Sequence, residues 1–76
     1  MTNRKKLLIT GVSGMLGSNL AYYFRDEYQI VGLYNQYEIC IDRVETSKCD
    51  LINEDEIEDC LKIYSPDIII HCASLT

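Results

Sequence analysis

Residues 7–17 read Leu-Leu-Ile-Thr-Gly-Val-Ser-Gly-Met-Leu-Gly, and this stretch decides the fold. An apolar run of strand character enters a turn with glycines at positions 11, 14 and 17, and a helical pattern follows at once. A helix that starts directly after a glycine turn presents unpaired backbone N–H groups. Together with the helix dipole, these groups attract a diphosphate. The sequence therefore predicts a dinucleotide site near the N-terminus.

The three glycines have separate predicted tasks. Gly11 permits the tight turn, Gly14 lets the backbone approach a pyrophosphate, and Gly17 lets the helix lie close to the sheet. Their spacing is Gly-x-x-Gly-x-x-Gly, one residue longer between the first two glycines than the dehydrogenase pattern Gly-x-Gly-x-x-Gly. Glycines alone are weak evidence because all turns are rich in them. The strand before and the helix after favour the phosphate-binding interpretation over a plain turn.

Composition narrows the function classes. The chain has 76 residues, at most one small domain, and its net charge of −5 argues against nucleic-acid binding. No apolar run reaches the length of a membrane span and no export signal is recognised, so we expect a cytoplasmic protein without a membrane partner. The four cysteines form no Cys-x-x-Cys pair, so neither a metal site nor a disulfide framework is expected. Cys60 and Cys72 are predicted to be small buried residues, whereas the exposure of Cys40 and Cys49 stays open.

Hydrophobic periodicity predicts an alternating order of strands and helices. A parallel sheet with right-handed crossovers then has the strand order 3-2-1-4, the first half of a doubly wound α/β fold. The apolar last strand would leave a bare sheet edge, so we expect the chain to be an incomplete part of one domain. Strands are predicted at 6–10, 29–34, 47–51 and 67–73, with a short extra strand within 37–41, and helices at 15–26 and from the capping residue Asn53 to Ser65-Pro66.

Three motifs together support a resemblance. They are Thr10-Gly11-x-x-Gly14-x-x-Gly17, Asp50-Leu51, and the run Pro66-Asp67-Ile68-Ile69-Ile70-His71-Cys72-Ala73-Ser74. With them the chain resembles the extended short-chain dehydrogenase/reductase family over all 76 residues. The most similar branch is that of dTDP-4-dehydrorhamnose reductase and related sugar-nucleotide-binding proteins, which includes the non-catalytic β regulatory subunit of methionine adenosyltransferase. The resemblance implies the N-terminal portion of an NAD(P)-binding Rossmann domain.

The resemblance also implies roles for matching residues. The backbone from Ser13 to Leu16 would line the pyrophosphate, Asp50 would reach the adenine amino group, and Leu51 would pack on the adenine ring. Residues 72–74 would pass the ribose on the nicotinamide side. The plain alternatives are a strand-end carboxylate in water for Asp50 and ordinary small packing residues for Ala73 and Ser74. The full cofactor-binding set is Gly11, Ser13, Gly14, Met15, Leu16, Gly17, Asn35, Asp50, Leu51, Cys72, Ala73 and Ser74.

The end of the second predicted strand bears on the choice of nucleotide. An acidic residue there would hold both ribose hydroxyls and repel a 2′-phosphate, but Asn35 carries no charge. Arg43, eight positions further on, is a cation that a loop would bring back to a phosphate. NADP(H) is therefore slightly favoured over NAD(H).

No catalytic residue is predicted within the chain. His71 has no nucleophile or carboxylate beside it in sequence, so a core or sheet-edge role is favoured. The family uses a Tyr-x-x-x-Lys pair for proton transfer, and no tyrosine here has a lysine four residues on. The resemblance implies a longer parent that transfers a hydride to a nucleotide-activated keto-sugar, bound mainly by residues beyond Thr76. The alternatives are a non-catalytic NADP(H)-binding regulatory subunit and a sugar-nucleotide epimerase or dehydratase, and a homo-oligomer stays open.

Overall fold

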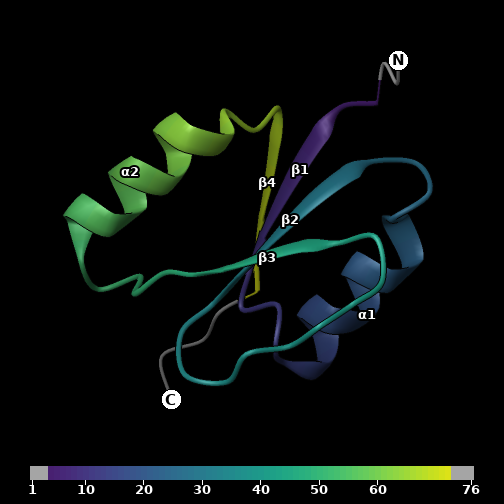
Figure 1. Ribbon diagram of the computed structural model, residues 1–76, viewed down its shortest axis with the longest axis horizontal. Coiled ribbons are helices and arrows are strands. Elements are labelled where there is room, and N and C mark those ends of the chain that lie inside the picture. The colour runs from purple at the N-terminus through teal and green to yellow at the C-terminus, as the bar shows by residue number, and fades with distance from the viewer. Residues whose placement is uncertain (1–3, 73–76) are drawn as a thin grey trace.

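Between residues 4 and 72, the chain forms four parallel strands and two helices (Figure 1). The computed structural model describes residues 4–72. The strands lie in the order β3-β2-β1-β4, which confirms the predicted α/β arrangement. In chain order the elements are β1 (Lys6–Thr10), α1 (Met15–Phe24), β2 (Gln29–Tyr34), β3 (Glu45–Lys48), α2 (Glu54–Tyr64) and β4 (Ile68–His71).

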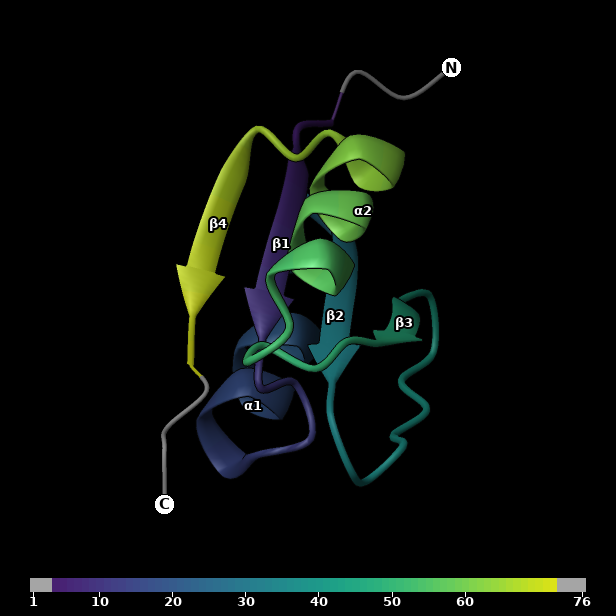
Figure 2. The ribbon, with the colours of Figure 1, turned by 90° about the vertical axis from the view of Figure 1, so that its left-hand side faces the viewer.

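The two helices cover opposite faces of the sheet (Figures 1 and 2). Successive side chains of a strand point to opposite faces, so the three apolar residues at the centre of β1 contribute to both cores. Within residues 4–72, neither helix combines the length and apolar character that a bilayer crossing requires. The core on the α1 side holds Leu7, Ile9, Val12, Ala21 and Ile30, and the core on the α2 side holds Leu8, Val31, Leu33, Cys49 and Cys60.

The four cysteines are free thiols in different surroundings. Cys60 is buried, as predicted, and so is Cys49. Cys72 is half-buried and packs at the margin of the core on the α1 side, so the prediction of burial holds for it only in part. Cys40 is exposed in the segment between β2 and β3.

The segment between β2 and α2 differs most from the prediction. The third strand covers Glu45–Lys48 instead of 47–51, because its register is set by pairing with Val31–Tyr34 of β2. The extra strand predicted within 37–41 is wrong. Ile41 forms only an isolated antiparallel bridge with Val44, around Arg43 at φ 66°. The bounds of β3 were missed because β3 is polar and has no apolar pattern of its own.

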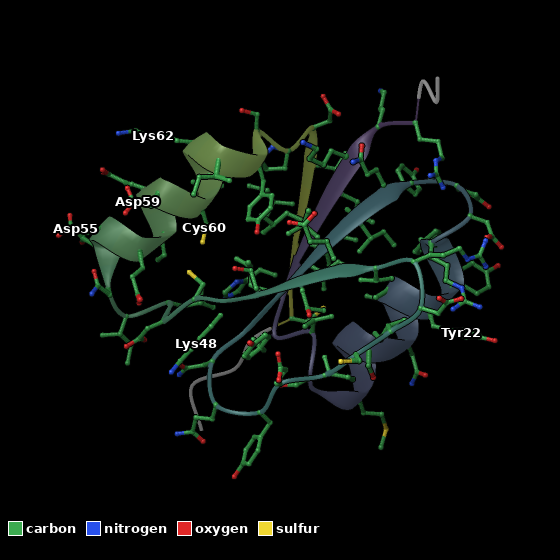
Figure 3. The ribbon with its side chains drawn as sticks, viewed as in Figure 1. Tyr22, Lys48, Asp55, Asp59, Cys60 and Lys62 are labelled. Carbon is green, nitrogen blue, oxygen red and sulfur yellow. The ribbon has the colours of Figure 1, made fainter. Side chains whose placement is uncertain are left out.

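The ends of α1 and α2 follow local signals. The first helix ends at Phe24, two residues before the predicted end, and the Phe24 carbonyl accepts from the N–H groups of Glu27 (3.0 Å) and Tyr28 (2.9 Å). The second helix begins after Asn53, as predicted, and the Asn53 side chain accepts from the amides of Asp55 (3.0 Å) and Glu56 (3.3 Å). It ends at Tyr64, and Ser65, which follows as the C-cap, has a left-handed φ of 45°. Asp55, Asp59 and Lys62 point away from the sheet, and Cys60 points toward it (Figure 3).

The strand β4 lies at one edge of the sheet, beside β1 (Figure 2). It covers four of the seven residues predicted for it. Asp67 precedes it, with its carboxylate accepting from the Lys6 N–H at 2.8 Å, and Ala73 lies outside the described residues. Ile68 and Ile69 are 37% and 53% exposed. Within residues 4–72, the outer side of β4 is therefore an open apolar edge, as expected.

Candidate functional site

The turn between β1 and α1 has the predicted geometry. Gly11 adopts φ 70°, a left-handed conformation that side chains disfavour. The Gly14 N–H donates to the Gly11 carbonyl at 3.1 Å and closes the turn. Gly14 is the residue before the first helical residue, and its carbonyl accepts from the Ser18 N–H at 2.9 Å. The chain thus passes from strand to helix within four residues.

The N-terminal amides of α1 have no capping side chain among residues 4–72, and the first turn of the helix carries no acidic residue. The first residues of any helix have N–H groups without an intrahelical acceptor, here Met15, Leu16 and Gly17. Met15 and Leu16 are 84% and 63% exposed. The positive end of the helix dipole is therefore accessible to an anion.

The fold itself requires three of the four glycines, but not Gly14. A Cβ at Gly17 would clash with the Gly11 carbonyl oxygen and lie 3.0 Å from the Val12 Cα, and a Cβ at Gly32 would lie 2.5 Å from the Val12 Cγ2. Gly11 is required by its φ. A Cβ at Gly14 would meet only the Gly11 carbonyl oxygen, at an ordinary 3.4 Å. Gly14 itself has φ −77° and ψ 168°, values open to any residue.

Two residues that hold this turn in place went unrecognised in the sequence, Val12 within the turn and Gly32 on β2. Val12 is fully buried, packs against Gly32 of β2, and donates its N–H to the Leu33 carbonyl at 3.0 Å. The available signal was the glycine inside the apolar run of β2, because a glycine within a strand often marks the close approach of another backbone.

The carboxyl end of β4 is tied to the same turn. The Thr10 hydroxyl shares a 2.7 Å hydrogen bond with the His71 Nδ1, and it accepts from the Cys72 N–H at 3.1 Å. The Thr10 carbonyl accepts from that N–H as well. His71 thus lies on the edge strand and bonds to β1, and the predicted site residues Ala73 and Ser74 lie outside the described residues. Among residues 4–72, no three His, Cys, Asp or Glu side chains are grouped so as to hold a metal ion.

Asp50 and Leu51 follow β3 at the carboxyl edge of the sheet. The Asp50 Oδ1 accepts from the Ile52 N–H at 3.0 Å, and the Asp50 N–H donates to the Glu56 carboxylate at 3.0 Å. Leu51 is half-buried against the core on the α2 side. Because all four strands are parallel, the glycine turn, Asn35, Asp50 and Cys72 all follow strand ends at the same edge (Figure 2). In open parallel sheets, ligands bind at this edge.

A carboxylate lies close to the end of β2, although Asn35 itself carries no charge. The Tyr34 hydroxyl donates to the Glu38 carboxylate at 3.3 Å, and the pKa of Tyr34 is raised by desolvation and by that carboxylate. Arg43, the cation considered for a 2′-phosphate, instead pairs with the Asp26 carboxylate at 2.8 Å. The structure therefore places no arginine from the 35–44 segment on Asn35.

Comparison with known proteins agrees with this geometry. The family model "NAD dependent epimerase/dehydratase family" matches residues 7–76. GDP-6-deoxy-D-talose 4-dehydrogenase of Aggregatibacter actinomycetemcomitans is 35% identical over 93% of this chain and 21% of its own length. Methionine adenosyltransferase 2 subunit beta of Danio rerio is 29% identical over 96% of this chain and 22% of its own.

A solved structure of similar fold also matches the chain. The hypothetical dTDP-4-dehydrorhamnose reductase of Sulfolobus tokodaii superimposes with a TM-score of 0.81 and 34% identity, over 93% of this chain and 24% of that one. The chain therefore spans only 21%, 22% and 24% of the lengths of these three proteins. On the family match across nearly its whole length, the chain belongs to the NAD dependent epimerase/dehydratase family.

Proposed function

We propose that this chain binds the adenosine diphosphate part of a nicotinamide dinucleotide, with the pyrophosphate on the amides at the start of α1. Gly14 carries this proposal. It is the one glycine of the four that neither packing nor backbone conformation requires, and it stands where a bound phosphate would approach the backbone most closely. Membership in a family described as NAD dependent supports the same ligand class.

The remaining contacts follow from the strand ends. The backbone of Ser13, Gly14, Met15 and Leu16 would hold the diphosphate oxygens. Asp50 uses Oδ1 in its own turn, so Oδ2 is the oxygen that would accept from the adenine amino group, beside Leu51. Cys72, with Ala73 and Ser74 after it, would line the ribose on the nicotinamide side.

The preference for NADP(H) over NAD(H) depends on Asn35 alone. The pairing of Arg43 with Asp26 and the presence of Glu38 on the Tyr34 hydroxyl both lower the electrostatic advantage of a 2′-phosphate. Titrating NAD⁺ and NADP⁺ separately at low salt measures this preference. Tighter binding of NADP⁺ supports the role given to Asn35, and tighter binding of NAD⁺ contradicts it.

For the whole protein we propose an oxidoreductase that acts on a nucleotide-activated sugar by hydride transfer to a keto-sugar, as in dTDP-4-dehydrorhamnose reductase. The similarity to a GDP-sugar 4-dehydrogenase supports this class. The nicotinamide supplies or accepts the hydride, and these residues orient the dinucleotide. No tyrosine here has a lysine four residues on, so proton transfer would need groups outside this sequence. An epimerase or dehydratase of the same family would use the same dinucleotide site.

A non-catalytic nucleotide-binding subunit is the second candidate. The similarity to methionine adenosyltransferase 2 subunit beta favours it. The two candidates differ in turnover. A reductase oxidises NADPH or NADH when a nucleotide-activated keto-sugar is added to the whole protein, whereas a regulatory subunit binds the dinucleotide without consuming it.

Nuclear magnetic resonance of the ¹⁵N-labelled chain tests the binding site. On titration with NAD⁺ or ADP, we expect the largest amide shifts at Met15, Leu16 and Gly17, because their N–H groups would gain charged acceptors. Adenosine, which lacks phosphates, is the control and should leave these amides unchanged. Shifts confined to other parts of the chain, or no shift at all with ADP and NAD⁺, would contradict the proposal.

A further inference from the structure

Two glycines allow close packing against the turn between β1 and α1 from both sides. On one side, Gly17 of α1 leaves room for the Gly11 carbonyl and the Val12 Cα. On the other side, Gly32 of β2 leaves room for the Val12 side chain, whose Cγ2, Cβ and Cγ1 would lie 2.5, 2.8 and 3.0 Å from a Cβ at Gly32. The turn is therefore enclosed between a helix and a strand at van der Waals contact.

Val12 is the only buried residue in the stretch from Gly11 to Leu16. Its side chain is fully enclosed by the core on the α1 side, and its N–H is fixed on the Leu33 carbonyl at 3.0 Å. Ser13 and Gly14 come directly after it and are exposed, and no side chain caps the helix that follows. Val12 is thus the side-chain anchor nearest to the amides that face solvent.

We propose that Val12 is a positioning residue, which sets the amides of Ser13 to Leu16 in the arrangement that receives a diphosphate. Through Gly32 and Leu33, it ties this arrangement to the carboxyl end of β2, where the ribose of the dinucleotide would lie. The identity of the ligand rests on the proposed function. The placement of the amides by Val12 does not, and it is measurable without ligand.

Val12→Ala tests the proposal, with Val31→Ala as its matched control. Val31 is equally buried, but its side chain belongs to the core on the α2 side of the sheet, whereas Val12 belongs to the core on the α1 side. Both variants lose the same two methyl groups from a core and should lose stability alike. Only Val12→Ala should shift the amides of residues 13–16, and only this variant should bind NAD⁺ about tenfold more weakly.

Val12→Thr is the conservative variant. It keeps the β-branched shape against Gly32 but buries a hydroxyl, so it should lose stability while keeping NAD⁺ affinity near that of the wild type. A folded Val12→Thr variant with displaced amides and lost affinity overturns the proposal. If Val12→Ala does not fold, the amide shifts and the NAD⁺ affinity of Val12→Thr decide whether the proposal stands.

The ligand-free measurement separates the two proposals. If the wild type fails to bind NAD⁺ while Val12→Ala still displaces the amides of residues 13–16, the proposed function fails and the positioning role stands. If these amides have the same shifts in Val12→Ala and Val31→Ala, the positioning role is overturned, whatever the ligand.

Discussion

The two helices of this chain begin in opposite ways. The helix α2 begins with Asn53, whose side chain accepts from two backbone amides, and its first turn carries three acidic residues. The helix α1 begins with Gly14, has no side-chain cap, and has no acidic residue in its first turn. In α2, the N-terminal amides and the dipole are neutralised by the protein itself. In α1, the N-terminal amides and the dipole remain available to a bound anion.

The comparison shows how one fold separates stability from binding. A helix start that serves stability has side chains of the protein that accept hydrogen bonds from its N-terminal amides. A helix start that serves an anion keeps them open, and relies on packing elsewhere for its position. Here that packing is the close contact of Gly17 and Gly32 with the turn between β1 and α1.

Gly17→Ala should have the largest effect, because it removes the close contact on which the open helix start depends. The new Cβ would clash with the Gly11 carbonyl, so we expect a loss of about 3 kcal/mol in the free energy of unfolding. Urea unfolding followed by circular dichroism measures it. Asn19→Ala, an exposed change on the same helix, is the control, and equal stability of the two variants would refute the close packing.

Gly14→Asn should convert the start of α1 into one like that of α2. The backbone at position 14 already has cap geometry, so stability should be unchanged or slightly higher. The new side chain would occupy the amides, and NAD⁺ binding should weaken by about 2 kcal/mol, or roughly thirtyfold. Calorimetry checks this. An asparagine variant that binds NAD⁺ as tightly as the wild type would contradict the comparison.

The core beneath α2 should respond to alkaline pH. Burial, and then the neighbouring Cys60 thiol, raise the pKa of Cys49 from 9 to about 12. Its neutral form is favoured by folding, so this contribution is complete below pH 9. It is lost as pH rises toward 12, by at most about 1.4 kcal/mol per pH unit. Urea unfolding between pH 8 and 11 should show a shallower decline for Cys49→Ala than for the control Cys40→Ala, and equal slopes would count against it.

Asn53→Ala should have the smallest effect. Removing the cap of α2 should cost about 1 kcal/mol of stability and leave NAD⁺ affinity unchanged. Asn53→Asp keeps an acceptor oxygen and is the control for both measurements. Loss of NAD⁺ affinity in the folded alanine variant would mean that the two helix starts are not independent.

The sequence predicts those features that depend on neighbours in the chain. The apolar run of β1, the left-handed Gly11 and the cap at Asn53 each have a local signature. The bounds of β3 do not, because Glu-Thr-Ser-Lys becomes a strand only by pairing with β2.

Some contacts of the candidate site could not be predicted from the sequence either. The contact of Val12 with Gly32 joins residues twenty positions apart, and it exists only because β2 lies beside β1. The pairing of Arg43 with Asp26 likewise depends on where the chain turns after β2. The tasks of Gly11 and Gly17 were predictable because each answers a backbone requirement of its own. The roles given to Gly14, Asn35, Asp50 and Leu51 stay predictions.

Gly14→Ala tests the central claim most directly, because it adds one methyl group where the protein has room for it and a bound phosphate would not. We predict that the variant melts within a few degrees of the wild type. In the same buffer, calorimetry should show NAD⁺ affinity reduced at least about tenfold. Full NAD⁺ affinity in the folded variant, or a loss of stability as large as that of Gly17→Ala, would contradict the account.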